Sequence, residues 1–410
     1  MRHRLSVTLP ARTVGDLEQD RGGLVVWRPD RTWIAEDQRP RLGIDFLRTP
    51  GERRVSSELP AWFENLLPEH GGRLRSRLCA HFGLREGASF ALLRKLGTDL
   101  PGAVEAHAMQ ELANGHEGVD PHEGDGDGPS HFSALAGMQL KFTMSMIQDR
   151  LTLSARHEGR LWIVKLPGSD YEELAEVETA TMRWAARAGF DVPTHRTEPF
   201  ENLVGLPHWV EGGAPVFAIE RFDRRADGSK VHHEDLCQAL GFRPAHKNGD
   251  ANPGVRFDGV LRLVHDTCGE NDAREMSRRL GFVIASGNGD AHLKNWSLVW
   301  GDRERPSLAP CYDLVATVSW PPFGWLNKGG PRMALRIGTT RRFADLDAKW
   351  LAEFAATAGY GWIPEEVIAG VQAAKSALAA VDVAVPERMS SALAEHWRRV
   401  PLLRVVGSPW

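Results

Sequence analysis

The residues that could do chemistry most directly are two aspartates and one asparagine in the last third of the chain. Asp290 is followed five positions later by Asn295, and Asp313 lies in the next strand-like segment. An aspartate can orient and deprotonate an attacking hydroxyl, while an asparagine and a second aspartate supply the oxygen ligands that magnesium prefers. The pattern therefore predicts phosphoryl transfer from a nucleotide. Because such a spacing also arises by chance, its meaning depends on the elements around it.

A lysine and a glutamate upstream form a second candidate pair. Lys165 stands near the end of an apolar strand predicted at residues 161–166, where an ammonium is costly to bury without a partner. Glu178 falls in the middle of a helix predicted at residues 169–188, whose first residues have capping-box spacing. In kinases such a pair holds the α- and β-phosphates of ATP. The alternative is a lysine that reaches solvent from an edge strand, beside a solvated glutamate.

A further apolar segment, residues 216–223, ends abruptly in charged residues. We expect it to form a strand beside the adenine and to continue into a hinge between two lobes. The backbone groups of Glu220, Arg221 and Phe222 are the predicted contacts of the base. Asp290 itself follows an apolar helix predicted at residues 271–285, so it should lie at the start of a loop in a helical region.

Composition places these residues in an ordinary globular protein. The chain has 410 residues, 42% hydrophobic and 25% charged, with a net charge of -4, so no overall positive field favours direct nucleic-acid binding. The sequence shows neither a signal-peptide pattern nor an 18-residue apolar span, and we expect a cytoplasmic protein without a membrane segment. The cysteines lack C-x-x-C spacing, which argues against a zinc site or a disulfide framework; they are Cys79, Cys237, Cys268 and Cys311.

The order of elements predicts an α+β protein in four parts. Residues 1–108 combine strands and helices, and residues 132–224 are rich in strands. Residues 109–131 are acidic, rich in glycine and without apolar periodicity, which predicts a mobile linker. A calcium loop at residues 125–128 is an alternative that lacks most of the ligand pattern. Residues 225–410 are mostly helical.

Hydrophobic periodicity locates the individual elements of the first and last parts. In the first part the expected strands are 4–9, 22–27 and 32–35, and the expected helices are 59–68, 72–82 and 88–93. In the last part the expected helices are 234–240, 258–265, 271–285, 347–357, 364–379 and 387–398.

Several short motifs follow one another along nearly the whole chain. They are FENLLP at residues 63–68, GAV at 102–104, AGMQLK at 136–141, IVKLP at 163–167, ERFDR at 220–224, EDLCQ at 234–238, DAHLKN at 290–295 and PCYDL at 310–314. Each is short, but their order and spacing together are specific. On these motifs the chain resembles the HipA family of bacterial toxin-antitoxin serine/threonine kinases. The resemblance implies a two-lobed protein-kinase-like fold with an additional N-terminal α/β subdomain and a mostly helical C-terminal lobe.

The resemblance also implies roles for individual residues. Asp290 would be the catalytic aspartate, Asn295 and Asp313 the ligands of Mg2+, and Lys165 the lysine that holds the ATP phosphates. His292 and Tyr312 match the family pattern beside the nucleotide, with His292 either orienting the loop by a hydrogen bond or contacting a phosphate. A phosphate-binding loop is implied at Ala136, Gly137, Met138, Gln139, Leu140 and Lys141.

Members of this family are inactivated by phosphorylation of a serine just ahead of the phosphate loop. Here Ser133 lies four residues before Gly137, while Ala134 occupies the position closest to the family's usual register. Ser133 is therefore the candidate for autophosphorylation, and a plain loop serine is the alternative. A phosphate there would add about two negative charges beside the nucleotide and would disfavour ATP by like-charge repulsion.

Together the residues and the resemblance predict an ATP- and Mg2+-dependent serine/threonine protein kinase that acts as the toxin of a bacterial toxin-antitoxin pair. The resemblance implies a helix-turn-helix antitoxin of the HipB kind as partner, and DNA contacts only through that antitoxin. It also implies a protein substrate, which in relatives can be an aminoacyl-tRNA synthetase. One alternative is a small-molecule kinase of the aminoglycoside-phosphotransferase type. The other is a catalytically silent protein that represses transcription together with an antitoxin.

Overall fold

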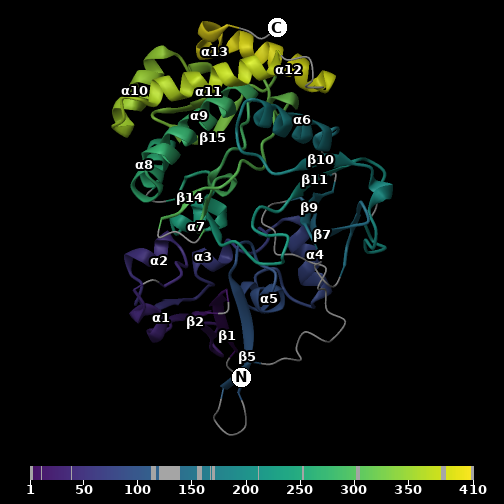
Figure 1. The fold of residues 1–410 in the computed structure, drawn as a ribbon, viewed down its shortest axis with the longest axis vertical. Coiled ribbons are helices and arrows are strands. Elements are labelled where there is room, and N and C mark those ends of the chain that lie inside the picture. Colours follow the sequence, from purple (N-terminus) through teal and green to yellow (C-terminus); the bar gives the residue numbers. More distant parts are fainter. Residues whose placement is uncertain are drawn as a thin grey trace.

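The computed structural model of the chain shows three parts along its longest axis (Figure 1). An N-terminal unit lies at one end, a helical lobe at the other, and a strand-rich lobe beside them. The fold is α+β and kinase-like, as predicted. No helix within the described residues is long and apolar enough to cross a membrane. The described residues are 3–10, 12–37, 39–111, 117–119, 139–154, 159–166, 168, 171–210, 212–251, 254–301, 305–379 and 385–407.

The N-terminal unit is built on a six-stranded antiparallel sheet in the order β4-β3-β2-β1-β5-β6. Alternate residues of the inner strand β1, namely Leu5, Val7 and Leu9, are buried, which is the period of a strand with one face in the core. The strands are β1 (His3–Leu9), β2 (Arg12–Gln19), β3 (Val25–Pro29), β4 (Arg54–Ser56), β5 (Glu105–Glu111) and β6 (Glu117–Val119). The helices are α1 (Arg31–Ala35), α2 (Ile44–Arg48), α3 (Ala61–Glu64), α4 (Arg73–His81) and α5 (Ser89–Leu96).

In this unit β2, β4, β5 and α2 have no counterpart among the predicted elements, and two predictions differ from the structure. Residues 32–35, expected as a strand, lie in helix α1, because the carboxylate of Asp30 accepts hydrogen bonds from the amides of Thr32 and Trp33 and caps the helix. The sheet also extends past residue 108, since β6 pairs with β5 and brings residues 117–119 of the expected linker into the unit. The rest of the expected linker after β5 lies outside the described residues.

A second antiparallel sheet, in the order β10-β11-β9-β7-β8, forms the strand-rich lobe. Its middle strand β9 pairs Lys165 with Lys141 of β7 on one side and with Phe217 of β11 on the other. Helix α6 begins at Leu174, later than expected, after Glu173 in a left-handed conformation. The elements are β7 (Lys141–Ile147), β8 (Arg150–Thr152), β9 (Leu161–Lys165), α6 (Leu174–Arg187), β10 (His195–Glu198), η1 (Phe200–Asn202) and β11 (Val216–Glu220).

Helices α9 and α11 form the centre of the helical lobe and lie so close that glycine is required where they touch. A Cβ atom on Gly281 of α9 would stand 2.3 Å from the carbonyl oxygen of Val367. One on Gly370 of α11 would stand 2.0 Å from the carbonyl oxygen of Arg278. The helices are α7 (Leu236–Ala239), α8 (Phe257–Cys268), α9 (Glu270–Ser286), α10 (Ala348–Ala358), α11 (Ile363–Leu378), α12 (Glu387–Arg399) and α13 (Pro401–Val406), so each helix predicted in this lobe has a counterpart.

Short strands and 3-10 turns connect these helices and carry the loops of the cleft. A three-stranded sheet has the order β12-β13-β14, and β15 pairs with β16 as a hairpin. The elements are β12 (His233–Asp235), η2 (Pro244–His246), η3 (Leu293–Asn295), β13 (Ser297–Val299), β14 (Ser307–Leu308), η4 (Thr317–Ser319), β15 (Arg332–Ile337), β16 (Thr340–Arg342) and η5 (Phe343–Asp345).

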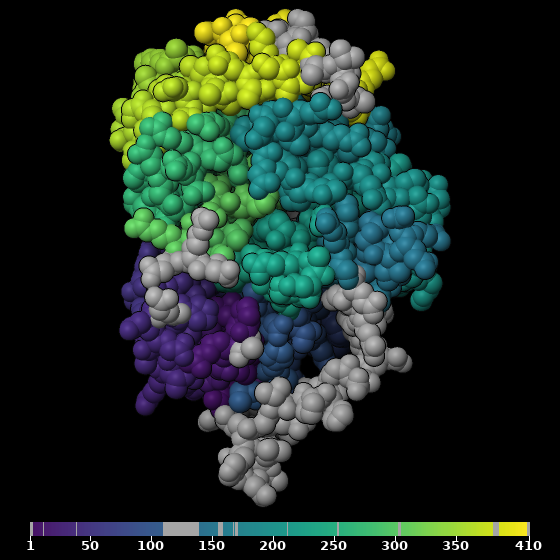
Figure 2. All heavy atoms as spheres, in the orientation of Figure 1, coloured from purple at the N-terminus to yellow at the C-terminus, as the bar shows by residue number. Residues whose placement is uncertain are grey.

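The N-terminal unit and the strand-rich lobe share one hydrophobic core. Leu74 of α4 packs in the same cluster as Phe142 and Val164 of the lobe's sheet. Helix α6 belongs instead to the core of the helical lobe, where Trp184 packs against Phe282 of α9. The space-filling view shows the N-terminal unit directly against the rest of the molecule (Figure 2). The unit is therefore an integral part of the folded body.

Candidate active site

The loop that carries Asp290 starts where helix α9 ends, and two glycines set its path. Gly287 caps α9 in a left-handed conformation, with φ 62°, and a Cβ atom there would stand 2.6 Å from the side chain of Val318. A Cβ atom on Gly289 would stand 2.6 Å from the carbonyl oxygen of Arg332. Because neither position has room for a side chain, the chain reaches Asp290 along one defined path.

Hydrogen bonds hold Asp290 and Asn295 next to each other. The amide of Asp290 donates to Oδ1 of Asn288 at 2.9 Å, and Nδ2 of Asn295 donates to the carbonyl oxygen of Asp290 at 2.8 Å. Because the nitrogen of the Asn295 side chain is used in this way, its Oδ1 is the atom left to face a ligand. The side chain of Asp290 is 65% exposed, so an incoming hydroxyl can reach it.

Lys165, Glu178 and Asp313 meet in one cluster, although Lys165 and Asp313 are 148 residues apart in the chain. Nζ of Lys165 donates to Oε1 of Glu178 at 2.5 Å and also to Oδ1 of Asp313. Asp313 has a left-handed backbone, with φ 58°, a strained conformation that is common at functional sites. The structure thus contains the predicted pair of Lys165 and Glu178, and the alternative of a solvent-directed lysine is wrong, since Lys165 is buried.

Tyr312 fixes the position of its neighbour Asp313. Its hydroxyl donates to the carbonyl oxygen of Lys294 at 2.8 Å and lies 2.6 Å from Oγ of Ser297. Burial raises the pKa of Tyr312 well above its ordinary value, so the hydroxyl stays protonated. Tyr312 therefore uses its hydroxyl to join Asp313 to the loop that carries Asn295, and the residue itself lines the cleft described below.

The charged cluster keeps Lys165 and Asp313 ionised. Burial opposes the charged form of Lys165, but Asp313 and Glu178 outweigh it and raise the pKa of the ammonium. Burial would raise the pKa of Asp313 as well, but Lys165 and then Lys141 outweigh it and hold this pKa below its ordinary value. Burial raises the pKa of Glu178 to about 7, against the attraction of Lys165. A fixed positive charge therefore lies next to an ionised Asp313.

The pKa values of Asp290 and His292 are shifted in the opposite directions to those of Asp313 and Lys165. Burial between the walls of the cleft, followed by repulsion from Asp313, raises the pKa of Asp290 to about 6, even though its open side faces water. Burial and then Lys247 lower the pKa of His292 to about 3, so the imidazole is neutral. Nε2 of His292 is 3.9 Å from Oδ1 of Asp290, and its buried Nδ1 has no partner within the part of the chain that the structure describes. Among the described residues, neither contact of the His292 ring is therefore a hydrogen bond that would orient the loop.

All three parts of the molecule line one cleft of about 1560 Å³ around these groups. The N-terminal unit contributes Glu69 and Arg73, the strand-rich lobe contributes Lys141 and Lys165, and the helical lobe contributes Asp290. Ligand pockets for small molecules are usually below about 1000 Å³, so this cleft has room for a nucleotide and part of a larger substrate. Of the expected phosphate loop, Gln139 and Leu140 also line the cleft; Ala136, Gly137, Met138 and the candidate Ser133 lie outside the described residues.

Two backbone amides of the expected hinge are already hydrogen-bonded within the protein, which the sequence does not predict. The amides of Glu220 and Arg221 donate to the carbonyl oxygens of Thr194 and Leu161 at 2.8 Å each, so neither amide can donate to a base. These two predicted base contacts are therefore limited to carbonyl groups. The ring of Phe222 lies along the cleft, with its centroid 5.7 Å from that of the Tyr312 ring.

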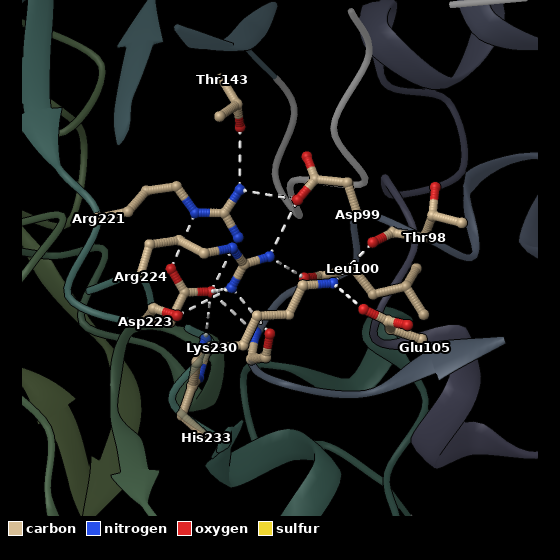
Figure 3. Close-up of polar contacts among 11 residues, drawn as sticks. Thr98, Asp99, Leu100, Glu105, Thr143, Arg221, Asp223, Arg224, Lys230 and His233 are labelled. Atoms are coloured by element: carbon tan, nitrogen blue, oxygen red, sulfur yellow. Dashed lines mark hydrogen bonds and ion pairs between the residues drawn. The ribbon is translucent and has the colours of Figure 1, made fainter. Parts of the chain in front are cut away.

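The side chain of Arg221 turns into a group that we call the hinge cluster, formed by the buried Arg221, Asp223 and Arg224 and the partly buried Asp99 (Figure 3). Arg221 donates to both carboxylate oxygens of Asp223 at 2.8 Å each, which is a bidentate pair. Arg224 donates to Oδ1 of Asp99 at 2.9 Å and to the carbonyl oxygen of Leu100 at 2.8 Å. Since Asp99 and Leu100 belong to the N-terminal unit, the hinge cluster fastens that unit to the hinge.

A second polar tether joins the N-terminal unit to the Asp290 loop, and the sequence assigns no function to it. Nζ of Lys294 donates to Oδ1 of Asn65 at 2.9 Å and to Oδ2 of Asp235 at 2.6 Å. The available signal was a polar residue, Asn65, within the apolar run of the FENLLP motif. Such a residue is usually exposed, so only the tertiary contact shows its partner.

The two-lobed fold, with its cleft between a strand-rich and a helical lobe, defines the kinase-like class. Two family models cover most of the chain: that of the HipA N-terminal domain matches residues 5–107, and that of the HipA-like C-terminal domain matches residues 133–388. The chain therefore belongs to the HipA family, as the motifs of its sequence predicted.

Several named proteins are similar to this chain. "Putative kinase Y4dM" of Sinorhizobium fredii is 35% identical over 376 residues, which cover 86% of this chain and 85% of that protein. "Serine/threonine-protein kinase toxin HipA" of Shewanella oneidensis is 28% identical over 300 residues, covering 66% of this chain and 65% of that one. A chain in the solved complex of HipA, HipB and operator DNA from Shewanella oneidensis matches with a TM-score of 0.72 at 22% identity, over 99% of this chain and 98% of that chain. This last similarity concerns the fold.

Proposed function

We propose that this protein is an ATP- and Mg2+-dependent serine/threonine protein kinase that acts as a HipA-type toxin. One observation carries the proposal: Asp290, Asn295, Asp313 and Lys165, from distant segments of the chain, line one cleft. Phosphoryl transfer needs a carboxylate for the acceptor hydroxyl, oxygen ligands for the metal and a fixed cation for the phosphates. The kinase names of the relatives support it.

The donor groups in the cleft suit Mg2+ and nucleotide phosphates. Mg2+ takes one or two protein oxygens and completes its shell with water and phosphate, so the carboxylate of Asp313 and Oδ1 of Asn295 would suffice. Within the described residues no group of three or more His, Cys, Asp or Glu side chains could hold a metal ion on its own. Lys165, and Lys141 opposite it on β7, would face the phosphates. When bound, Mg-ATP supplies the phosphoryl group that is transferred.

The chain's own residues would then have separate tasks. Asp290 orients the acceptor hydroxyl and takes its proton, a task for which a pKa of about 6 is well matched to neutral pH. Lys165 presents a positive charge that Glu178 and Asp313 already hold in place, so little reorganisation is needed when charge develops on the phosphoryl oxygens.

The proposal extends to partners. The similar Shewanella oneidensis structure contains HipA together with HipB and operator DNA. We therefore propose a helix-turn-helix antitoxin as a partner of this chain, with DNA bound through the antitoxin. The proposed substrate is a protein, and an aminoacyl-tRNA synthetase is the first one to test. Self-inactivation by phosphorylation of Ser133 completes the proposal.

Transfer of label from γ-labelled ATP in the presence of magnesium tests the kinase activity. We expect label on the protein itself and on a protein in cell extract, lost without Mg2+ and in Asp290→Ala, with mass spectrometry finding the self-label at Ser133. Arg225→Ala, which changes an exposed residue next to the hinge cluster, is the matched control. Label on small alcohols or aminoglycosides alone would favour the small-molecule kinase. Failure to bind Mg-ATP in calorimetry would favour the silent co-repressor.

A further inference from the structure

Lys294 joins the loop of residues 290–295 to the N-terminal unit with all the hydrogen-bonding capacity it has. The three hydrogens of its ammonium face three oxygens: Oδ1 of Asn65 at 2.9 Å, the carbonyl oxygen of Asn65 at 3.2 Å and Oδ2 of Asp235 at 2.6 Å. Lys294 is buried, so these oxygens replace the water that its charge would otherwise hold. Two of the three belong to one residue of the N-terminal unit.

Asn65 is itself held in a single orientation. It is buried, and its Nδ2 donates to the carbonyl oxygens of Ala61 at 2.9 Å and Phe242 at 2.7 Å. Two carbonyl acceptors identify the nitrogen of the carboxamide, so Oδ1 must be the atom that faces Lys294. Since Phe242 lies in the helical lobe, Asn65 bridges the two parts at both ends of its side chain.

The backbone around Lys294 carries the groups of the proposed reaction. Asn295 follows it directly, and Asp290 lies four positions before it. The carbonyl oxygen of Lys294 accepts the hydroxyl of Tyr312 at 2.8 Å, and Tyr312 immediately precedes Asp313. A shift of Lys294 would therefore displace all three carboxylate and carboxamide groups of the site.

A neighbouring path from the N-terminal unit leads to the same loop. The amide of Leu293 donates to the carbonyl oxygen of Lys247 at 2.9 Å. Nζ of Lys247 in turn lies 2.9 Å and 3.1 Å from the two carboxylate oxygens of Glu69, which follows the FENLLP motif. Residues 65–69 thus hold two consecutive positions of the loop, Leu293 by its backbone and Lys294 by its side chain.

We propose that Asn65 is a positioning residue for phosphoryl transfer, which holds the loop of residues 290–295 in its active geometry through Lys294. The inference rests on the proposed kinase function, and it makes the N-terminal unit a working part of the active site. A residue needed only to dock the unit could be apolar, because its backbone carbonyl would still accept from Lys294. The side chain of Asn65 adds Oδ1, the closer of its two acceptors for this buried charge in the loop of residues 290–295. Misplacing reacting groups by about 1 Å can cost about 100-fold in rate, so this geometry matters.

The test compares Asn65→Ala with Trp62→Phe in the full-length chain. Trp62 lies on helix α3 just before Asn65, and its Nε1 donates to Oε2 of Glu234 at 3.1 Å, so the control also removes a buried hydrogen bond between the N-terminal unit and the helical lobe. We expect Asn65→Ala to lower kcat at least about tenfold and to raise the free Mg2+ needed for half-maximal rate, with a much smaller change in KM for ATP. Trp62→Phe should keep kcat within about twofold of the wild type.

A double variant shows whether Asn65 acts through Lys294. If it does, Asn65→Ala combined with Lys294→Met should have no lower kcat than Lys294→Met alone. If Asn65→Ala fails to fold by circular dichroism, Lys294→Met combined with Asp235→Asn replaces it in the comparison with Trp62→Phe. In that variant the bonds of Asn65 to Ala61 and Phe242 stay intact and no buried carboxylate loses its cation.

The possible outcomes separate the two proposals. Three outcomes would overturn the positioning role while the kinase activity stands. They are an unchanged kcat in Asn65→Ala, a loss of kcat no larger than that of Trp62→Phe, and additive losses of kcat in the double variant. A wild type that transfers no phosphoryl group would overturn the proposed function, and the inference with it.

Discussion

The hinge cluster and the charged group around Lys165, which we call the cleft cluster, have the same number of positive and negative side chains but different surroundings. Each contains two cations and two carboxylates, which are Arg221, Arg224, Asp99 and Asp223 at the hinge, and Lys141, Lys165, Glu178 and Asp313 in the cleft. At the hinge the side chain of Arg221 is 1% exposed and is packed between two parts of the molecule. In the cleft the side chain of Asp313 is 28% exposed and opens onto the space beside Asp290.

The comparison shows that a shifted pKa alone does not identify a catalytic group in this protein. Burial would raise the pKa of Asp223, but Arg221 and Arg224 outweigh it and hold the pKa well below the ordinary value, much as Lys165 does for Asp313. A perturbed pKa therefore does not distinguish a docking contact from a catalytic one. Arg221 and Asp223 also border the cleft, so what distinguishes the clusters is exposure: the side chain of Asp313 is 28% exposed and can exchange its partner for a ligand, whereas that of Asp223 is 6% exposed.

The largest expected effect comes from Asp290→Asn, which removes the proposed proton acceptor and keeps the shape. We expect phosphoryl transfer to fall about 10²- to 10⁴-fold. Thermal stability should not fall, because Asp290 is exposed and Asp313 repels its ionised form. Label transfer and a melting curve measured on the same preparation check both statements. A variant that kept most of its activity would remove Asp290 from the mechanism.

Arg224→Met at the hinge should act on stability and leave the chemistry intact. Removing one partner of a buried ion pair leaves Asp99 and Asp223 undercompensated, and costs about 3–5 kcal/mol of unfolding free energy. Urea denaturation measures the loss, and Arg225→Met at an exposed position should stay within about 0.5 kcal/mol of the wild type. A stable Arg224→Met protein that had lost turnover would break the comparison, since the hinge cluster would then belong to the active site.

Glu234→Gln tests a buried carboxylate outside both clusters, which contacts the N-terminal unit from the helical lobe. Burial raises the pKa of Glu234 to about 8, while three N-H donors favour the carboxylate: the amide of Ile44 at 2.9 Å, Nε1 of Trp300 at 3.0 Å and Nε1 of Trp62 at 3.1 Å. The oxygen of a carboxamide can still accept from Ile44 and Trp300, but its NH2 group would face Nε1 of Trp62. We therefore expect a loss of about 1–3 kcal/mol in urea denaturation above pH 8, where Glu234 is ionised. Turnover of the folded protein should be unchanged, whereas a selective loss of turnover would show that this contact also shapes the cleft.

Asp290 in the cleft and Asp223 in the hinge cluster should take up protons at different pH values. Because the pKa of Asp290 is raised to about 6, the base is protonated below that pH, and kcat/KM should fall about tenfold per pH unit there. Asp223 has a pKa held below its ordinary value of 3.8, so its contribution to stability is present above pH 4 or so and is lost only at lower pH. A pH-rate profile and melting curves in the same buffers check this. An unchanged fall of kcat/KM near pH 6 in Asp290→Asn would contradict the assignment to Asp290.

Local pattern was sufficient to predict much of the framework. The strand at β9 and the helix at α9 follow from hydrophobic periodicity, which depends only on neighbours in the chain. Residues 32–35 were open to correct prediction too, since Asp30 stands at an N-cap position just before them. Their apolar, β-branched composition favoured a strand, and the cap outweighed it.

Some features of the site could likewise be predicted from the sequence, and others could not. Motif spacing named Asp290, Asn295 and Asp313, because the chemistry of phosphoryl transfer restricts which residue types serve it. Spacing could not show that the amides of Glu220 and Arg221 are used within the sheet, because that depends on which strands pair.

By itself the sequence determined the kinds of elements, the family and the residues able to do the chemistry, since each depends on short-range pattern or on residue type. Only the tertiary structure decided which distant polar side chains meet. Asn65 and Lys294 are 229 residues apart, and Asp99 and Arg224 are 125 apart, so nothing in their local sequence identifies the partner. Burial makes the cations Lys294 and Arg224 depend on those partners, and burial arises only when the three parts pack together.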